Sequence, residues 1–142
     1  MTKESRSMEE RQRDLSRYRM EKAKDDPGVS KLNLDSKKFS QSINRSYYSM
    51  FHAARALLAL ETFDSKKHSG VISHFNQYYI KPGHIEAEYF KMLTIAFQVR
   101  NDCDYDDFYI ATLEEAKNQY ENAVRFIERI EKYIKTVLSE HE

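Results

Sequence analysis

Residues 39–60 read FSQSINRSYYSMFHAARALLAL, and this stretch, which contains neither glycine nor proline, decides the fold. Its apolar residues recur at steps of three and four, the period of a helix with a wide buried face. They are Phe39, Ile43, Tyr47, Met50, Phe51, Ala54, Leu57 and Leu58. The sequence therefore predicts a buried helix from Lys37 to about Glu61, with Ser36 as its N-cap.

A second stripe on this helix is polar and aromatic. It consists of Arg45, Tyr48, His52 and Arg55, at steps of three, four and three residues. Such groups on an otherwise buried helix need partners: another helix, another subunit or a phosphate-bearing ligand. The two arginines could steer a polyanion or form salt bridges between subunits, and the second alternative is slightly favoured.

Composition bounds the class of protein. The chain has 142 residues with only three Gly and two Pro, which favours one domain of long helices and short loops. The single cysteine, Cys103, excludes an intrachain disulfide and fits a reducing compartment. No segment resembles a signal peptide and no apolar run is long enough to span a bilayer. We therefore expect a soluble, cytoplasmic protein.

The net charge is zero, but the charges are unevenly distributed. Residues 27–100 carry ten Lys and Arg against five Asp and Glu, whereas residues 101–142 carry five against eleven. The basic middle could form a nucleic-acid surface, or the two segments could attract each other within one bundle. The sequence favours neither interpretation over the other.

The N-terminal segment is densely charged and has a thin apolar stripe. We expect a helix that ends near Asp25, with residues 1–10 frayed. Pro27 is unfavourable inside a helix and favoured at a first turn, so a separate short helix is expected to start there. A single kinked helix is the alternative.

Three further helices are predicted in the C-terminal half. The first covers residues 68–80 and stops at Lys81-Pro82-Gly83, and the second runs from Ile85 to about Cys103. Thr112 and Glu115 form a capping box that starts the last helix. Its heptad stripe could be a dimerisation seam, but a partner helix of the same chain is favoured. The chain is thus predicted to be all-α, an antiparallel up-and-down bundle of four long helices plus short helices.

The sequence shows no metal-ligand spacing. The five histidines do not pair with one another at helical spacing, and no Glu-x-x-His motif occurs. Glycine is too scarce for a phosphate loop or a dinucleotide fingerprint. We therefore expect neither a metal nor a cofactor.

The segment RNDCDY, residues 100–105, ends the helix that starts at Ile85. Arg100 and Asp104 lie one turn apart on the same face, with Asn101 beside them and Tyr105 next. An arginine held among apolar residues by a carboxylate is a preorganised phosphate ligand. It could also be a helix-end ion pair, and the residue pattern alone favours that interpretation.

Three blocks resemble the HEPN family (higher eukaryotes and prokaryotes nucleotide-binding) in order and spacing, most closely its small stand-alone prokaryotic members. They are NRSYYSMFHAARALL (44–58), KKHSGVISHFNQYYIKPG (66–83) and an R-x4-Y motif followed by DDFY (100–109). The resemblance implies a helical bundle, commonly a homodimer, that works beside a nucleotidyltransferase, often as a toxin–antitoxin pair. In active members it implies a metal-independent ribonuclease.

The family's catalytic signature is an arginine, an adjacent polar residue and a histidine four to six residues further on. Arg100 and Asn101 match the first two positions, but Tyr105, Asp106 and Asp107 stand at the spacing of the histidine. A tyrosine, with an ordinary pKa of about 10, is a poor base near neutrality. Asp102, Asp106 and Asp107 would also repel RNA phosphates.

Two functional hypotheses follow. Arg100, Asn101, Asp104 and Tyr105 form the candidate catalytic site, to which His52 or His68 could supply the missing imidazole from another helix. Tyr105 could instead be a hydroxyl that a partner nucleotidyltransferase modifies. The candidate nucleotide- or RNA-binding residues are Arg45, Tyr48, Arg55, Lys66, Lys67 and His68. The protein is either a metal-independent endoribonuclease or a catalytically silent module that docks a partner or holds a nucleotide.

Overall fold

Helices account for all the regular secondary structure in the described residues of the computed structural model, which are 3–61, 63–65 and 67–140, with side chains described from residue 9 onwards. In chain order they are α1 (Lys3–Asp35), α2 (Phe39–Ala59), α3 (His68–Phe75), the π-helical turn η1 (Asn76–Ile80), α4 (Ala87–Tyr105) and α5 (Leu113–Glu140).

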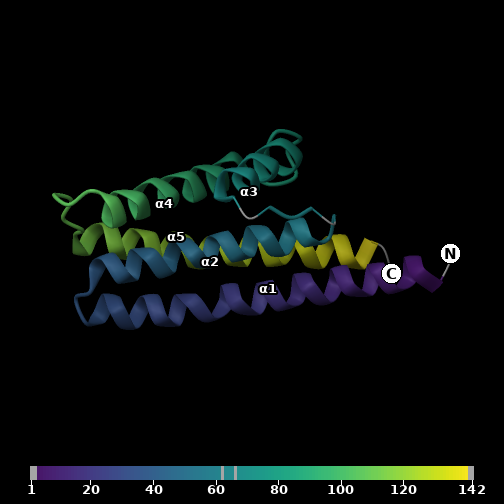
Figure 1. Cartoon of the computed structure of the whole chain (residues 1–142), viewed down its shortest axis with the longest axis horizontal. Coiled ribbons are helices and arrows are strands. Elements are labelled where there is room, and N and C mark those ends of the chain that lie inside the picture. Colours follow the sequence, from purple (N-terminus) through teal and green to yellow (C-terminus); the bar gives the residue numbers. More distant parts are fainter. Residues whose placement is uncertain (1–2, 62, 66, 141–142) are drawn as a thin grey trace.

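The four long helices alternate in direction along the molecule (Figure 1). α1 and α2 lie side by side, α5 packs on α2, and α3 and α4 lie on the other side of α2 from α1. The two chain ends lie at one end of the bundle, and the α1–α2 and α4–α5 connections lie at the other. This arrangement confirms the predicted antiparallel up-and-down bundle.

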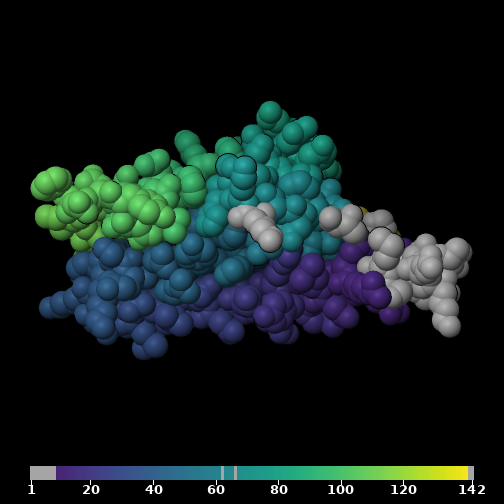
Figure 2. All heavy atoms as spheres, viewed as in Figure 1, coloured from purple at the N-terminus to yellow at the C-terminus, as the bar shows by residue number. Residues whose placement is uncertain are grey.

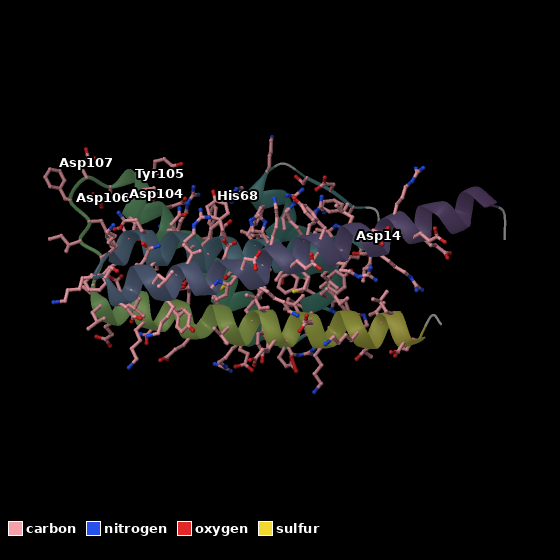
Figure 3. The ribbon with its side chains drawn as sticks, turned by 90° about the horizontal axis from the view of Figure 1, so that it is seen from below. Asp14, His68, Asp104, Tyr105, Asp106 and Asp107 are labelled. Carbon is pink, nitrogen blue, oxygen red and sulfur yellow. The ribbon has the colours of Figure 1, made fainter. Side chains whose placement is uncertain are left out.

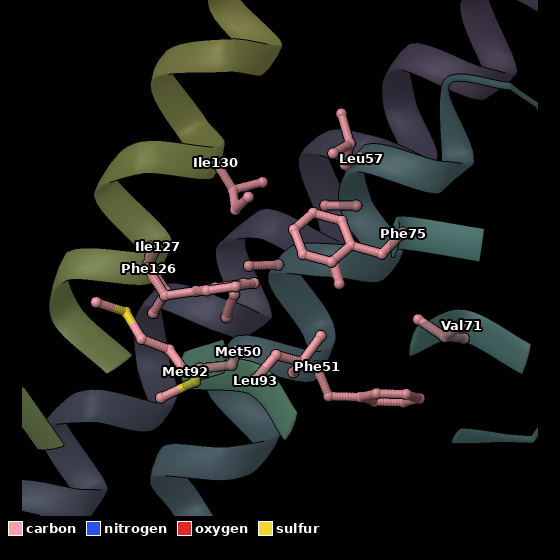
Figure 4. Packing of buried hydrophobic residues seen from close by; sticks show 14 of the residues in the cluster. Met50, Phe51, Leu57, Val71, Phe75, Met92, Leu93, Phe126, Ile127 and Ile130 are labelled. Carbon is pink, nitrogen blue, oxygen red and sulfur yellow. The ribbon is translucent and has the colours of Figure 1, made fainter. Parts of the chain in front are cut away.

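α2 is the central helix, as its apolar period predicts. Thirteen of its 21 residues are buried, and its side chains meet those of α3, α4 and α5 in one core (Figure 4). Phe75 from α3, Leu93 from α4 and Phe126 from α5 are all fully enclosed there. Each such side chain contributes about 1.5–3 kcal/mol on leaving water. The heptad stripe of α5 is likewise buried within the chain, through Ala123, Ile127 and Ile130 among others.

The predicted helix break at Pro27 is wrong. α1 continues through this residue without interruption, as the alternative of a single kinked helix requires; the kink itself stays a prediction. A proline inside a helix removes one backbone hydrogen bond and costs about 3 kcal/mol. Packing on both sides of Pro27 compensates this cost, because Ala23 before it and Ser30 and Leu34 after it are all buried. The backbone is helical from Lys3, residues 1–2 lie outside the described part, and the fraying of residues 1–10 stays a prediction.

The prediction that Ser36 is the N-cap of α2 is also wrong, because Ser36 belongs to the C-terminal end of α1. The amide of Lys38 donates to the carbonyl of Asn33, and that of Lys37 donates to Leu34, as in a Schellman motif. Lys37 has φ 63°, the left-handed conformation in which glycine is usual. α2 therefore starts later than expected, at Phe39, and its N-cap Lys38 makes no side-chain capping bond.

Serine hydroxyls join α1 to α2 near the connection between the two helices. The Ser30 hydroxyl lies 2.8 Å from the Ser46 hydroxyl and donates to the Ser42 carbonyl at 2.9 Å. The Ser42 hydroxyl donates in return to the Ser30 carbonyl at 2.9 Å. All three serines are fully buried, so these bonds satisfy polar groups in a contact where the backbones approach closely.

The C-terminal half agrees closely with its predicted boundaries. The helix predicted over residues 68–80 is formed by α3 and η1, and it ends at Ile80, before a turn that contains Gly83, whose φ of 88° suits glycine. α4 extends two residues past Cys103, to Tyr105. Thr112 and Glu115 form the predicted capping box, with the Glu115 amide 3.1 Å from the Thr112 hydroxyl and the Thr112 amide 3.1 Å from the Glu115 carboxylate.

Ion pairs at the contact of α4 and α5 run against the alternative in which a basic middle attracts an acidic end. Arg125 and Arg129 of the acidic segment pair with Glu88 and Glu86 of the basic one. Within the described residues, Arg100–Asp104 is the salt bridge that joins a base of residues 27–100 to an acid of residues 101–142. A search of the described helices finds none with the length and apolarity that crossing a membrane requires.

Candidate functional site

Arg100 lies near the C-terminal end of α4, with its side chain only 14% exposed. Its Nε lies 2.8 Å from Oδ2 of Asp104, so the expected ion pair is present. One terminal nitrogen donates to the Tyr48 hydroxyl of α2 at 3.1 Å, and the other donates to Asn101 Oδ1 at 3.4 Å. The Nε–H is not aligned for a hydrogen bond to any acceptor in the described part of the chain. A guanidinium held in place by a carboxylate is a preorganised ligand for a phosphate oxygen.

Aromatic rings surround this guanidinium. Its central carbon lies 5.7 Å from the ring centre of Tyr47, 5.3 Å from that of Tyr48 and 5.9 Å from that of Tyr105. Tyr47 is fully buried, whereas Tyr105 is 73% exposed. Cation–π contacts hold the arginine in place without neutralising its charge.

His68, the first residue of α3, is brought to the same place by the core residue Tyr47. Its Nδ1 lies 2.5 Å from the Tyr47 hydroxyl, and its ring stacks on Phe51 with a centre-to-centre distance of 4.2 Å. Burial, and then the positive charges of Arg100 and Arg55, lower the pKa of this imidazole below its usual value. His68 is therefore neutral near pH 7. Arg100, His68, Tyr47 and Tyr48 are called the Arg100–His68 site below.

His52 has a different environment, on the side of α2 that faces α1. Its Nε2 lies 3.9 Å from Oδ2 of Asp26, whose other oxygen is 3.6 Å from Arg45. Burial and the charge of Lys22 and its neighbours lower the pKa of His52 to about 4, so the Asp26 contact is not a salt bridge near neutrality. Burial also raises the pKa of Asp26, an effect that Arg45 partly opposes.

Tyr48 joins these groups to the Arg100–His68 site. Arg45 lies over its ring at 5.3 Å, and the His52 ring centre is 6.0 Å from it. The polar stripe predicted on α2 thus exists as a half-buried band, and Tyr48 contacts both Arg45 and Arg100. His52 is nevertheless one aromatic ring further from the guanidinium of Arg100, and its partner Asp26 lies on α1.

Arg55 continues the same band along α2. It pairs with Asp64 of the α2–α3 connection at 2.8 Å, and its guanidinium carbon is 6.0 Å from the ring centre of Phe51. Lys67 is exposed beside His68, whereas Lys66 lies outside the described residues.

The candidate residues gather on one edge of the molecule. Figure 3 shows His68, Asp104 and Tyr105 along the same edge, on the side away from α5. In the space-filling view, α2 is visible between α1 on one side and α3 and the α4–α5 connection on the other (Figure 2). The residues predicted for catalysis and those predicted for RNA binding therefore lie next to each other.

Four further residues of this region were not predicted. Tyr47 was counted only as a core residue, and its buried hydroxyl is what connects His68 to the rest of the site. Asp26, Arg19 and Asp64 contact the polar stripe from α1 and from a loop. A sequence signal exists only for Tyr47, because a buried tyrosine hydroxyl generally has a hydrogen-bond partner. No group of three or more His, Cys, Asp or Glu side chains suited to a metal ion occurs among the described residues.

Comparison with known proteins adds to this geometry. The model of the HEPN domain family matches residues 16–140. From Methanocaldococcus jannaschii, "Putative toxin MJ0605" is 34% identical over 119 residues, covering 84% of this chain and 88% of that protein. A second protein of the same organism, "Putative toxin MJ0142", is 31% identical over 115 residues, covering 81% and 78%. "UPF0332 protein PH1297" of Pyrococcus horikoshii is 52% identical over 63 residues, 44% of each chain.

The family model covers almost the whole bundle, from the second half of α1 to the end of α5, and includes every residue of the Arg100–His68 site. The two relatives named as toxins align over most of their own length as well as of this chain. The chain belongs to the HEPN family.

Proposed function

We propose that this protein is an RNA-directed HEPN toxin that acts as a metal-independent endoribonuclease, with Arg100 and His68 as its catalytic residues. The observation that carries the proposal is the meeting of these two side chains at Tyr47, which hydrogen-bonds to His68 and lies under the guanidinium of Arg100. The imidazole absent from the expected position after Arg100 is thereby supplied by α3. Arg100 and a histidine are the two groups that metal-free RNA cleavage requires.

The proposed reaction is attack of the ribose 2′-oxygen on the adjacent phosphorus. When Nδ1–H of His68 donates to Tyr47, Nε2 has a free lone pair and takes the proton of the 2′-hydroxyl. The new 2′-O–P bond forms as the P–O5′ bond breaks, and the leaving 5′-oxygen takes a proton from solvent. Arg100 stabilises the negative charge that builds on the phosphoryl oxygens. The products are a 2′,3′-cyclic phosphate and a free 5′-hydroxyl.

The cellular setting belongs to the proposal as well. The names of two relatives support a toxin, and a nucleotidyltransferase partner, a homodimeric state and a cytoplasmic location complete the proposed system. The exposed hydroxyl of Tyr105, next to Arg100, is the position at which such a partner could modify the site.

A second candidate function is a catalytically silent module that holds a nucleotide or docks a partner. The specific observation that favours it is the engagement of Arg100 with Asp104, Tyr48 and Asn101 of the same chain. Asp106 and Asp107 are also exposed close by in the chain, and carboxylates repel a phosphate backbone.

The test is cleavage of a mixed RNA substrate by purified protein in EDTA. Wild type, Arg100→Ala and His68→Gln are compared, with His84→Gln as the control because His84 is an exposed histidine of the connection between η1 and α4, where its ring stacks on Tyr133 of α5. We expect the wild type and the control to cleave and both site variants to lose activity by a factor of about 100 or more. If all four proteins leave the RNA intact, the ribonuclease is refuted and the silent module becomes the leading function.

A further inference from the structure

Asp64, in the connection between α2 and α3, receives two arginines from different helices. Its Oδ1 lies 2.8 Å from Arg55 of α2, and its Oδ2 lies 3.3 Å from Arg19 of α1. Arg19 also donates to the Arg55 carbonyl at 3.3 Å, which holds the two guanidinium groups close together. One carboxylate thus occupies the space between two converging cations.

This group carries two positive charges and one negative charge. The Arg19 side chain is 10% exposed and that of Arg55 is 25% exposed, whereas the carboxylate between them is 55% exposed. Burial and the charge of Arg55 lower the pKa of Arg19, and the hydrogen bond from Arg55 keeps the pKa of Asp64 below its usual value. The Nε of Arg55 has no hydrogen-bond acceptor among the described residues. One buried and one half-buried cation thus converge on a single, more exposed carboxylate.

We infer that Arg19 and Arg55 form a second phosphate subsite for single-stranded RNA, and that Asp64 fills this subsite in the free protein in place of a phosphate. A phosphate group carries its charge on several acceptor oxygens and can satisfy both guanidinium groups at once. Asp64 belongs to a loop and is the most exposed member of the group, so it is the member that can leave.

The position of the subsite fits an RNA strand that crosses the Arg100–His68 site. Arg55 is seven residues beyond Tyr48 on the same helix, which corresponds to about 10 Å along the axis. Phe51 lies between them and contacts both His68 and Arg55. The charges of Arg100 and Arg55, after burial, both lower the pKa of His68, so both cations act on this imidazole. The inference rests on the proposed function in its choice of RNA as ligand.

The ordinary alternative is that Asp64 only fastens the α2–α3 connection to the bundle. The two interpretations predict different RNA affinities for Asp64→Asn, which keeps the shape of the side chain and removes its charge. A structural salt bridge predicts a less stable protein with unchanged RNA binding. If Asp64 instead occupies a phosphate subsite, Asp64→Asn should bind RNA more tightly, whether or not the protein becomes less stable.

The experiment measures binding of a fluorescein-labelled 2′-O-methyl oligoribonucleotide of mixed sequence by anisotropy, over a range of salt concentrations. This probe has no 2′-hydroxyl, so binding is measured separately from cleavage. We expect Asp64→Asn to bind about fivefold more tightly at low salt, with a log–log salt slope steeper by about 0.7, the value for one more phosphate contact. Arg55→Gln should bind more weakly and lose a similar part of the slope.

Glu86→Gln is the matched control, because it frees Arg129 from an ion pair of the same 2.8 Å length between α4 and α5. Equal tightening by Glu86→Gln would overturn the inference, as would unchanged or weaker binding by Asp64→Asn. Should Asp64→Asn not fold, the Arg55→Gln result decides, since unaltered affinity and slope would remove the subsite. Binding that responds as expected without any cleavage of unmodified RNA would keep the subsite and refute the nuclease; cleavage without this response would do the reverse.

Discussion

The Tyr47 hydroxyl lies 2.5 Å from Nδ1 of His68, although the two residues are 21 positions apart and belong to different helices. Burial raises the pKa of Tyr47 above its ordinary value, so its hydroxyl keeps its proton. Tyr47 can therefore fix the orientation of the imidazole and decide which of its nitrogens faces the solvent, but it cannot act as a base itself.

Replacing Tyr47 by Phe removes this bond and leaves the ring that lies under Arg100. If Nδ1 donates to Tyr47 during the reaction, the bond stabilises the imidazolium, and its loss makes His68 less basic. We expect cleavage of RNA to slow by about tenfold and the lower inflection of the pH–rate profile to move to lower pH. An inflection that moves to higher pH would mean that Tyr47 donates to Nδ1, and His68 would then not be the base at Nε2.

Arg100→Lys tests whether a point charge can replace the guanidinium. Lysine cannot contact Asp104 and Tyr48 together while stacking against the rings of Tyr47 and Tyr105. We expect cleavage to fall by a factor of about 100–1,000, with only a small change in stability. Arg125→Lys, at an exposed ion pair on α5, should leave cleavage unchanged. A fully active Arg100→Lys protein would show that only the charge at this position matters.

His52 should make the protein less stable in acid. Its pKa in the folded state is lowered to about 4, below the ordinary value of about 6.5, so the unfolded chain binds the proton first as the pH falls. Stability is therefore complete above pH 6.5 and decreases between pH 6.5 and 4. We expect a loss of about 2 kcal/mol at pH 4.5 that His52→Gln does not show.

The measurement is urea unfolding of both proteins at pH 7.5 and pH 4.5. The difference between them is needed because the pKa of Asp26 is raised by burial, which stabilises the folded state in acid and opposes the effect of His52. Parallel losses in the wild type and His52→Gln would show that His52 is readily protonated in the fold.

Lys37→Gly should stabilise the bundle. Lys37 adopts φ 63° at the end of α1, a conformation that costs an ordinary residue about 1 kcal/mol and costs glycine almost nothing. We expect a gain of about 0.5–1 kcal/mol in the free energy of unfolding by urea. Lys38→Gly is the control, since Lys38 has φ −95° and should gain nothing. Equal or opposite effects of the two substitutions would count against the strain.

The sequence predicts the helices well because their signals are local. The apolar period of α2, the stop at Gly83 and the capping box at Thr112 each depend on residues within a few positions of one another. The predictions at Pro27 and Ser36 are wrong because they also rest on local preferences. The local preference at each is overruled, at Pro27 by the packing of α1 on α2 and at Ser36 by the left-handed turn at Lys37.

The site is less predictable than the fold. The pairing of Arg100 with Asp104 follows from helical spacing, but the approach of His68 depends on how α3 returns across α2. Tertiary packing against Phe51 and Tyr47 determines that approach. No regular residue spacing in the sequence indicates it. The contacts of Asp26, Arg19 and Asp64 are equally non-local, since each requires α1 or a loop to lie at a particular axial position along α2.

The buried serines help to set the axial position of α1 along α2. A hydroxyl reaches only the atoms directly beside it, so the bonds among Ser30, Ser42 and Ser46 exist at a single axial register of α1 against α2. Sliding α1 by one turn, about 5.4 Å, would break them and at the same time move Asp26 away from Arg45, and Arg19 away from Asp64. Three small side chains thus help to hold Arg19 and Asp26 of α1 level with their partners Asp64 and Arg45.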